Sequence, residues 1–160
     1  MTSERDPGPS VNRQLAVRDD HWCFGCGQQN PIGLKLPFFE EGASERVWAP
    51  WTPLREHQGF EGIAHGGLIT TVLDEVMGWV IYLRQIWAVT GTISVRFRKP
   101  VEVGVPTRAV AWVVKETGRK IDVAAELRRE SDDLLLAEAT AIFIRVPEEQ
   151  AQAWQGRYIV

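Results

Sequence analysis

The chain has 160 residues, with 18 Lys and Arg against 21 Asp and Glu, for a formal net charge of −3 at pH 7. This length is typical of a single domain with its own hydrophobic core. Without a basic excess, nucleic acid and anionic membrane surfaces are not expected as partners. The two cysteines are too few for a disulfide scaffold.

The N-terminal residues are polar and carry two prolines. We expect residues 1–20 to form a flexible arm, with a short helical turn over 13–17, ahead of a single domain over 21–160. The arm lacks the basic and apolar regions of a signal peptide, which predicts a cytoplasmic protein. Residues 21–34 place glycines and an Asn-Pro pair among aromatic and sulfur side chains, so we expect a compact loop there.

Strand-like alternation follows this loop. Apolar side chains at Leu34, Leu36 and Phe38 predict a strand, although Pro37 restricts it to an edge or a bulge. A second strand is predicted over 46–49. The next segment contains two prolines and two glycines, which predicts a loop over residues 50–62 with one helical turn at 54–57.

The longest apolar segment predicts a helix from Gly66 to Arg84. Its apolar side chains cover most of the circumference, which is typical of a helix buried nearly all round. Asp74, Glu75 and Arg84 interrupt it and leave an uncharged run of about eight residues, against the roughly 20 that a membrane span requires. We therefore expect a buried helix about 28 Å long in a soluble domain.

After the helix the apolar period becomes two. Ile93, Val95 and Phe97 alternate with polar side chains at 92, 94, 96 and 98. Further strands are predicted over 110–114, 121–128 and 134–146, with turns at 117–120 and 131–133 and a short helix over 147–156.

Consecutive strands joined by short turns imply an antiparallel sheet. Ala137, Ala139 and Ala141 share one face of the last strand and are small enough to let a thick element approach. We expect an α+β fold in which the sheet curls around the long helix. The helix flank and sheet edge that stay exposed favour dimerisation.

Three motifs resemble those of a known family. His65-Gly66-Gly67 begins the helix, Asp74 follows that histidine by nine positions, and the strand Val95-Arg96-Phe97-Arg98-Lys99-Pro100-Val101 comes later. Together they resemble the hotdog-fold acyl-CoA thioesterases of the phenylacetate-degradation (PaaI-like) type. Cys23-Phe24-Gly25-Cys26-Gly27 resembles the N-terminal signature of a subgroup. The resemblance extends from about Trp22 to Pro147 and implies the hotdog fold, an antiparallel sheet wrapped around one central helix.

The resemblance implies hydrolysis of an acyl-CoA thioester to a free acid and coenzyme A, without a cofactor, by a homodimer or dimer of dimers. Asp74 would be the general base or the nucleophile. The Gly66 N–H at the helix start would stabilise the oxyanion, with His65 orienting it. In the family these groups come from different subunits. Along one helix Gly66 and Asp74 lie about 12 Å apart, too far to contact one thioester, which points to a second, antiparallel helix.

Several of these residues also have structural interpretations. Thr70, Thr71 or a neighbouring strand would satisfy Asp74 by hydrogen bonding, and His65 would be a helix cap. Glu75, about 100° further round the helix, is expected to pair with Arg84 or a strand residue.

Many relatives carry an Asn six positions before the motif histidine, where this chain has Gly59. We predict that Gln58 or His57 takes that role. Thr90 lies where relatives place a hydroxyl that steadies the attacking water, or is simply a strand residue.

Gly67, Arg96 and Arg98, with Lys99, are predicted to meet the coenzyme A moiety, since guanidinium groups suit phosphates. Outward-facing charges on a strand are the alternative.

Cys23 and Cys26 have the spacing of half a zinc site. His21, His57 or a partner subunit would have to complete it, and we predict a buried structural loop without a metal. Two other functions stay open: a hydratase or dehydratase of the same fold, and a non-catalytic acyl-CoA binding or regulatory module.

Overall fold

The computed structural model describes residues 12–16 and 18–158. Their strands form one sheet in the order β1-β2-β3-β5-β6-β7-β4, and every pairing is antiparallel. The strands are β1 (Arg13–Gln14), β2 (Phe39–Glu40), β3 (Val47–Trp51), β4 (Ala88–Phe97), β5 (Thr107–Thr117), β6 (Lys120–Arg129) and β7 (Leu135–Arg145). The helices are η1 (Arg55–His57), α1 (Gly66–Leu83) and α2 (Glu148–Tyr158).

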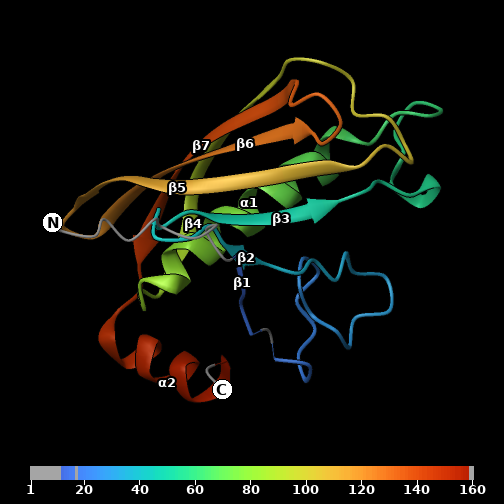
Figure 1. Ribbon diagram of the computed structural model, residues 1–160. Helices are drawn as coiled ribbons and strands as arrows, with labels where there is room; N and C mark the ends of the chain where they lie inside the picture. Colours follow the sequence, from blue (N-terminus) through green and yellow to red (C-terminus); the bar gives the residue numbers. More distant parts are fainter. Residues whose placement is uncertain (1–11, 17, 159–160) are drawn as a thin grey trace, which may run out of the picture.

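The helix α1 lies against one face of the sheet, and β3 to β7 pass around it (Figure 1). Its buried side chains are apolar: Ile69, Val72, Leu73, Val76, Met77, Val80 and Ile81. The helix is long and apolar enough to cross a membrane by length and composition, a test that the core helix of a soluble protein also passes. Here those side chains belong to the core of the domain.

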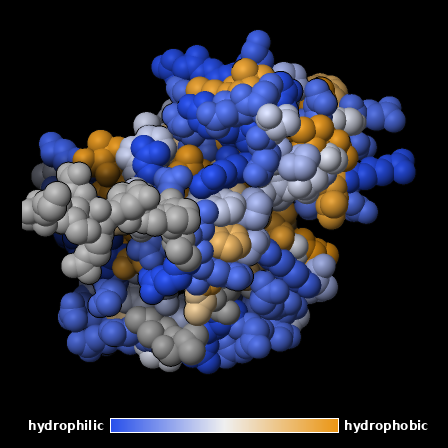
Figure 2. All heavy atoms as spheres, in the orientation of Figure 1, coloured by the Kyte–Doolittle hydropathy of each residue, from blue (hydrophilic) through white to orange (hydrophobic). Residues whose placement is uncertain are grey.

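Small side chains on the sheet let the helix approach closely. Ala137, Ala139 and Ala141 of β7 are all buried and face the core, as the sequence predicts. Ala125 on β6 and Ala111 on β5 continue this surface in register. The surface of the molecule differs from this apolar interior. The face in Figure 2 is mainly hydrophilic, with scattered hydrophobic side chains.

The N-terminal segment differs from the prediction in two places. The helical turn predicted over 13–17 is wrong for Arg13 and Gln14, which pair as β1 with β2, because an open sheet edge offers a ready hydrogen-bonding template. Val17 and residues 1–11 lie outside the described residues. Leu15 is nearly buried, and its N–H donates to the Phe38 carbonyl at 2.8 Å.

The strand predicted from Leu34 onward forms only in its last part, since β2 begins at Phe39. The N–H groups of Leu34 and Leu36 donate instead to the carbonyls of Phe24 and Gly25, at 2.8 and 2.9 Å. The alternation still buries Leu36 and Phe38. This segment therefore packs like a strand while its hydrogen bonds go to the glycine-rich loop.

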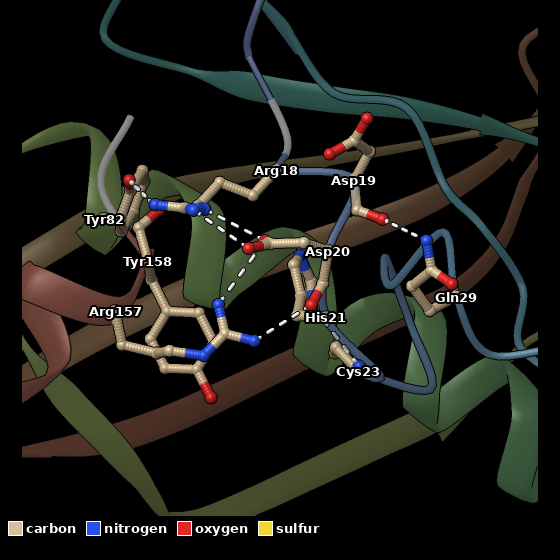
Figure 3. A network of polar contacts seen from close by, with 9 residues as sticks. All are labelled: Arg18, Asp19, Asp20, His21, Cys23, Gln29, Tyr82, Arg157 and Tyr158. Carbon is tan, nitrogen blue, oxygen red and sulfur yellow. Dashed lines mark hydrogen bonds and ion pairs between the residues drawn. The ribbon is translucent and has the colours of Figure 1, made fainter.

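The C-terminal helix α2 confirms the predicted tail helix and packs on the start of the chain. Figure 3 shows Asp20 between two guanidinium groups, those of Arg18 and of Arg157 on α2. The His21 ring meets the Tyr158 ring edge-on, with centroids 5.8 Å apart. These contacts hold residues 18–21 beside α2, at the end of the domain away from the start of α1.

Candidate active site

The start of α1 presents a backbone donor. His65 is the N-cap residue, and its Nδ1 accepts the Gly67 N–H at 2.9 Å. Within residues 12–16 and 18–158, no hydrogen-bond acceptor is recorded for the Gly66 N–H. The histidine thus caps the helix, engages the donor at Gly67, and leaves the one at Gly66 at the positive end of the helix dipole.

The loop before α1 is fixed by its own hydrogen bonds. The His65 N–H donates to the His57 carbonyl at 2.8 Å, and the Gln58 Oε1 accepts the Gly62 N–H at 3.1 Å. The His57 Nδ1 accepts the Leu54 N–H at 2.9 Å and so closes η1. The side-chain oxygen of Gln58 therefore shapes the loop. A direct catalytic role for Gln58 stays a prediction.

Asp74 lies half-buried on α1 and has one specific partner. The Thr90 hydroxyl of β4 donates to the Asp74 Oδ1 at 2.7 Å. Burial raises the pKa of Asp74 above its usual value, and the Thr90 hydrogen bond opposes this shift. Of the structural partners predicted for Asp74, the neighbouring strand is present as Thr90, whereas Thr70 and Thr71 donate instead to the carbonyls of Gly66 and Gly67.

A β-bulge places Thr90 on the inner face of β4. The β4–β7 register shifts between Thr90 and Thr92, where Gly91 is the extra residue. Strict alternation would turn Thr90 outward together with Thr92. The bulge lets both Thr90 and Ile93 face α1, and a glycine inside a strand pattern is the signal that predicts such a bulge.

Glu75 faces away from this pair and toward the N-terminal loop. The predicted ion pair with Arg84 is wrong, since Arg84 binds Glu45 and Glu116 at 2.9 and 2.7 Å. The Cys23 Sγ lies 3.5 Å from the Glu75 Oε1. Burial raises the pKa of Glu75 to about 7. The sequence alone did not indicate this thiol–carboxylate contact, because 52 residues separate its partners.

The cations predicted for coenzyme A lie on the surface, Arg96 within β4 and Arg98 just after it. Arg98 is exposed and forms an ion pair with Glu138 at 2.8 Å. Arg96 is exposed and lies opposite Glu138 in the β4–β7 register. The Gly67 N–H is held by His65. The binding of coenzyme A by these three groups stays a prediction.

Part of this chain is similar to a known protein family. Residues 61–136 match the family model of the Thioesterase superfamily. The matched segment contains His65, Gly66, Asp74 and Thr90. This segment is therefore similar to domains of the thioesterase superfamily.

Curated relatives of this superfamily domain include two acyl-coenzyme A thioesterases called THEM4. The Xenopus laevis protein is 29% identical over 119 residues, which cover 74% of this chain and 53% of that protein. The mouse protein is also 29% identical over 119 residues, covering 74% of this chain and 51% of its own length. The chain thus spans about half the length of these relatives.

Solved structures share the fold at lower identity. One crystal structure of a thioesterase superfamily protein has a TM-score of 0.71 at 23% identity, covering 76% of this chain and 62% of that chain. The Escherichia coli PaaI protein has a TM-score of 0.66 at 15% identity, covering 71% and 81%. A Streptococcus mutans protein bound to acetyl CoA has a TM-score of 0.61 at 16% identity, covering 91% and 95%. The predicted α+β hotdog fold is confirmed.

Proposed function

We propose that this protein hydrolyses acyl-CoA thioesters to a free acid and coenzyme A. The observation that carries the proposal is a half-buried Asp74, held by Thr90, on a helix whose first N–H is unpaired among the described residues. Asp74 takes a proton from water that attacks the thioester carbon, or attacks that carbon itself to form an acyl anhydride, which water then hydrolyses to the free acid and the Asp74 carboxylate. The carbonyl oxygen becomes an oxyanion that accepts the Gly66 N–H, and its collapse expels the thiolate of coenzyme A, which is then protonated.

The active site of this proposal needs two copies of the chain. Gly66 and Asp74 lie eight residues apart on α1, or about 12 Å at 1.5 Å per residue. The strand β4 ends the sheet, and residues 89–92 along it are exposed, so its edge is open to pairing with a second copy. A homodimer, or a dimer of dimers, would bring Gly66 of one protomer to Asp74 of the other.

The oxyanion role predicts a large effect of Gly66→Pro. Proline lacks the N–H, yet its fixed φ suits the first helical position, and His65 has the extended backbone that a following proline requires. We expect kcat/KM to fall by about 10²- to 10³-fold, with helix content unchanged by circular dichroism. Gly66→Ala is the matched control because it keeps the N–H, and its added Cβ meets only the exposed Phe97 ring, at 3.3 Å.

A mixed dimer tests whether the two groups come from different subunits. Gly66→Pro and Asp74→Asn chains carrying different tags are co-expressed, and the heterodimer is purified. If the site is shared, one of its two sites keeps both groups, and about half of the wild-type rate per dimer returns. A heterodimer as inactive as the two parent variants would show that both groups act within one protomer.

Thr90 is expected to act as a positioning residue. Thr90→Val keeps the shape but removes the donor to Asp74, and a hydrogen bond to a charged group contributes about 1.5–3 kcal/mol. We expect kcat to fall by about 10- to 100-fold with KM nearly unchanged, and Thr90→Ser to restore most of the rate. A Thr90→Val enzyme with full kcat would show that the contact is only structural.

The acyl group is identified by assaying release of free coenzyme A thiol from a panel of short, long and aromatic acyl-CoA substrates. Turnover above background supports hydrolysis. Calorimetric binding without turnover would favour a binding or regulatory module instead. A cytoplasmic location, and the absence of nucleic-acid or membrane partners, stay predictions from the composition of the chain.

A further inference from the structure

Three metal-binding side chains meet at the junction between the N-terminal loop and α1. Cys23 and Cys26 come from the loop, and Glu75 comes from the third turn of the helix. Their ligand atoms all lie within 4.8 Å of one another. The proposed hydrolysis uses none of the three.

Their spacing fits tetrahedral coordination. With metal–sulfur and metal–oxygen bonds of about 2.3 and 2.0 Å, two ligand atoms at the tetrahedral angle lie about 3.5 Å apart. The Cys23 Sγ lies 3.5 Å from one Glu75 oxygen and 3.7 Å from the other. A hydrogen bond from the Cys23 thiol to the Glu75 carboxylate has a similar length. A cobalt titration therefore distinguishes the metal-bound site from a hydrogen-bonded, metal-free one.

The loop is built to hold both thiols against the carboxylate. A turn closed by the Gly27 N–H and the Cys23 carbonyl, at 2.8 Å, brings the two cysteines together. A Cβ on Gly25 would lie only 2.4 Å from the Glu75 Cδ, so the backbone approaches the carboxylate as closely as glycine allows. The Leu36 N–H then ties the Gly25 carbonyl to the following segment at 2.9 Å.

The Glu75 carboxylate and the two thiols, once ionised, would favour a bound cation between the N-terminal loop and α1. Among residues 12–16 and 18–158, no Lys, Arg or His forms an ion pair with Glu75. Cys26 is buried and Cys23 is half-buried. A buried carboxylate is costly unless it is paired or coordinates a metal, and thiolates favour soft or borderline divalent ions.

We propose that Cys23, Cys26 and Glu75 bind a thiophilic divalent cation of the zinc class, which ties the N-terminal loop to α1. All three side chains line a cavity of about 270 Å³, which Arg18, His21 and Tyr82 also line. Three protein ligands leave one position of a tetrahedral ion open to this cavity. The site does not depend on the proposed hydrolysis, and neither result decides the other.

Cobalt is the probe for this site, because Co²⁺ takes the geometry of Zn²⁺ and is coloured. Full-length protein, reduced and stripped of metal under anaerobic conditions, is titrated with Co²⁺. We expect about one equivalent per chain, with tetrahedral visible bands and a thiolate-to-cobalt charge-transfer band, all lost when Zn²⁺ is added. Substoichiometric binding, or cobalt bands without the thiolate transition, would overturn the proposal.

Glu75→Gln is the deciding variant, since it keeps both thiols and the shape of the side chain. We expect it to weaken Co²⁺ binding more than tenfold, and the double variant Cys23→Ser/Cys26→Ser to abolish the thiolate band. Asp122→Asn on β6 is the matched control and should bind as the wild type does. Circular dichroism confirms folding of each variant. If folded Glu75→Gln binds Co²⁺ as tightly as the wild type, the carboxylate is not a ligand and the three-ligand site is wrong.

Discussion

Asp74→Asn is expected to lower kcat/KM for acyl-CoA hydrolysis by about 10²- to 10⁴-fold, the usual contribution of a general base. The amide has the shape of the carboxylate and keeps an oxygen for the Thr90 hydroxyl, so the local structure should survive. It cannot take a proton from water, and it is a poor nucleophile. Release of free thiol from the best substrate of the panel measures the loss.

The matched control for this variant is Asp122→Asn. Asp122 lies between the buried Ile121 and Val123 on β6 and so faces the other side of the sheet from α1. Its replacement should leave the rate within about twofold, as expected for a surface substitution. If folded, dimeric Asp74→Asn kept the full rate, Asp74 would be neither base nor nucleophile.

Phe38→Ala is expected to lower the free energy of unfolding by about 3–5 kcal/mol, the usual cost of deleting a buried phenyl ring. Phe38 is fully buried and stacks on Trp79 of α1, with ring centroids 4.6 Å apart. Its removal leaves a cavity between the N-terminal segment and the helix. Urea unfolding followed by tryptophan fluorescence measures the change.

Phe60→Ala removes the same group from a side chain that is 85% exposed. We expect its free energy of unfolding to stay within about 0.5 kcal/mol of the wild type. Should Phe38→Ala cost no more than Phe60→Ala, the segment before β2 would not belong to the core in solution.

The central helix was predictable because the residues that indicate it are consecutive in the sequence. A long run of apolar residues after a glycine pair predicts a helix from Gly66, and the structure ends it at Leu83, one residue before the predicted end. The later strands follow from alternation in the same way. By contrast, β1 has only two residues, and only the edge that β2 offers makes them a strand.

The candidate site likewise contains residues that the sequence indicated and contacts that it did not. Gly66 and Asp74 could be found because a motif and its spacing along one helix carry the information. The Thr90 contact depends on a bulge at Gly91, which reverses the alternation, and the Glu75 contact depends on where the N-terminal loop packs. Contacts between distant segments leave no periodic signal in the chain, so Thr90 was indicated only by the family resemblance, and the contact between Cys23 and Glu75 was not predicted.

Asp74 and Glu75 are consecutive residues, yet they contact different parts of the chain. Asp74 contacts β4, and Glu75 contacts the N-terminal loop. Both are fixed to one turn of a stiff helix. A rotation of α1 about its axis that shortened the contact between Asp74 and Thr90 would therefore lengthen the contact between Glu75 and Cys23. The contact between the N-terminal loop and Glu75 therefore also limits how far α1, and with it Asp74, can turn relative to β4.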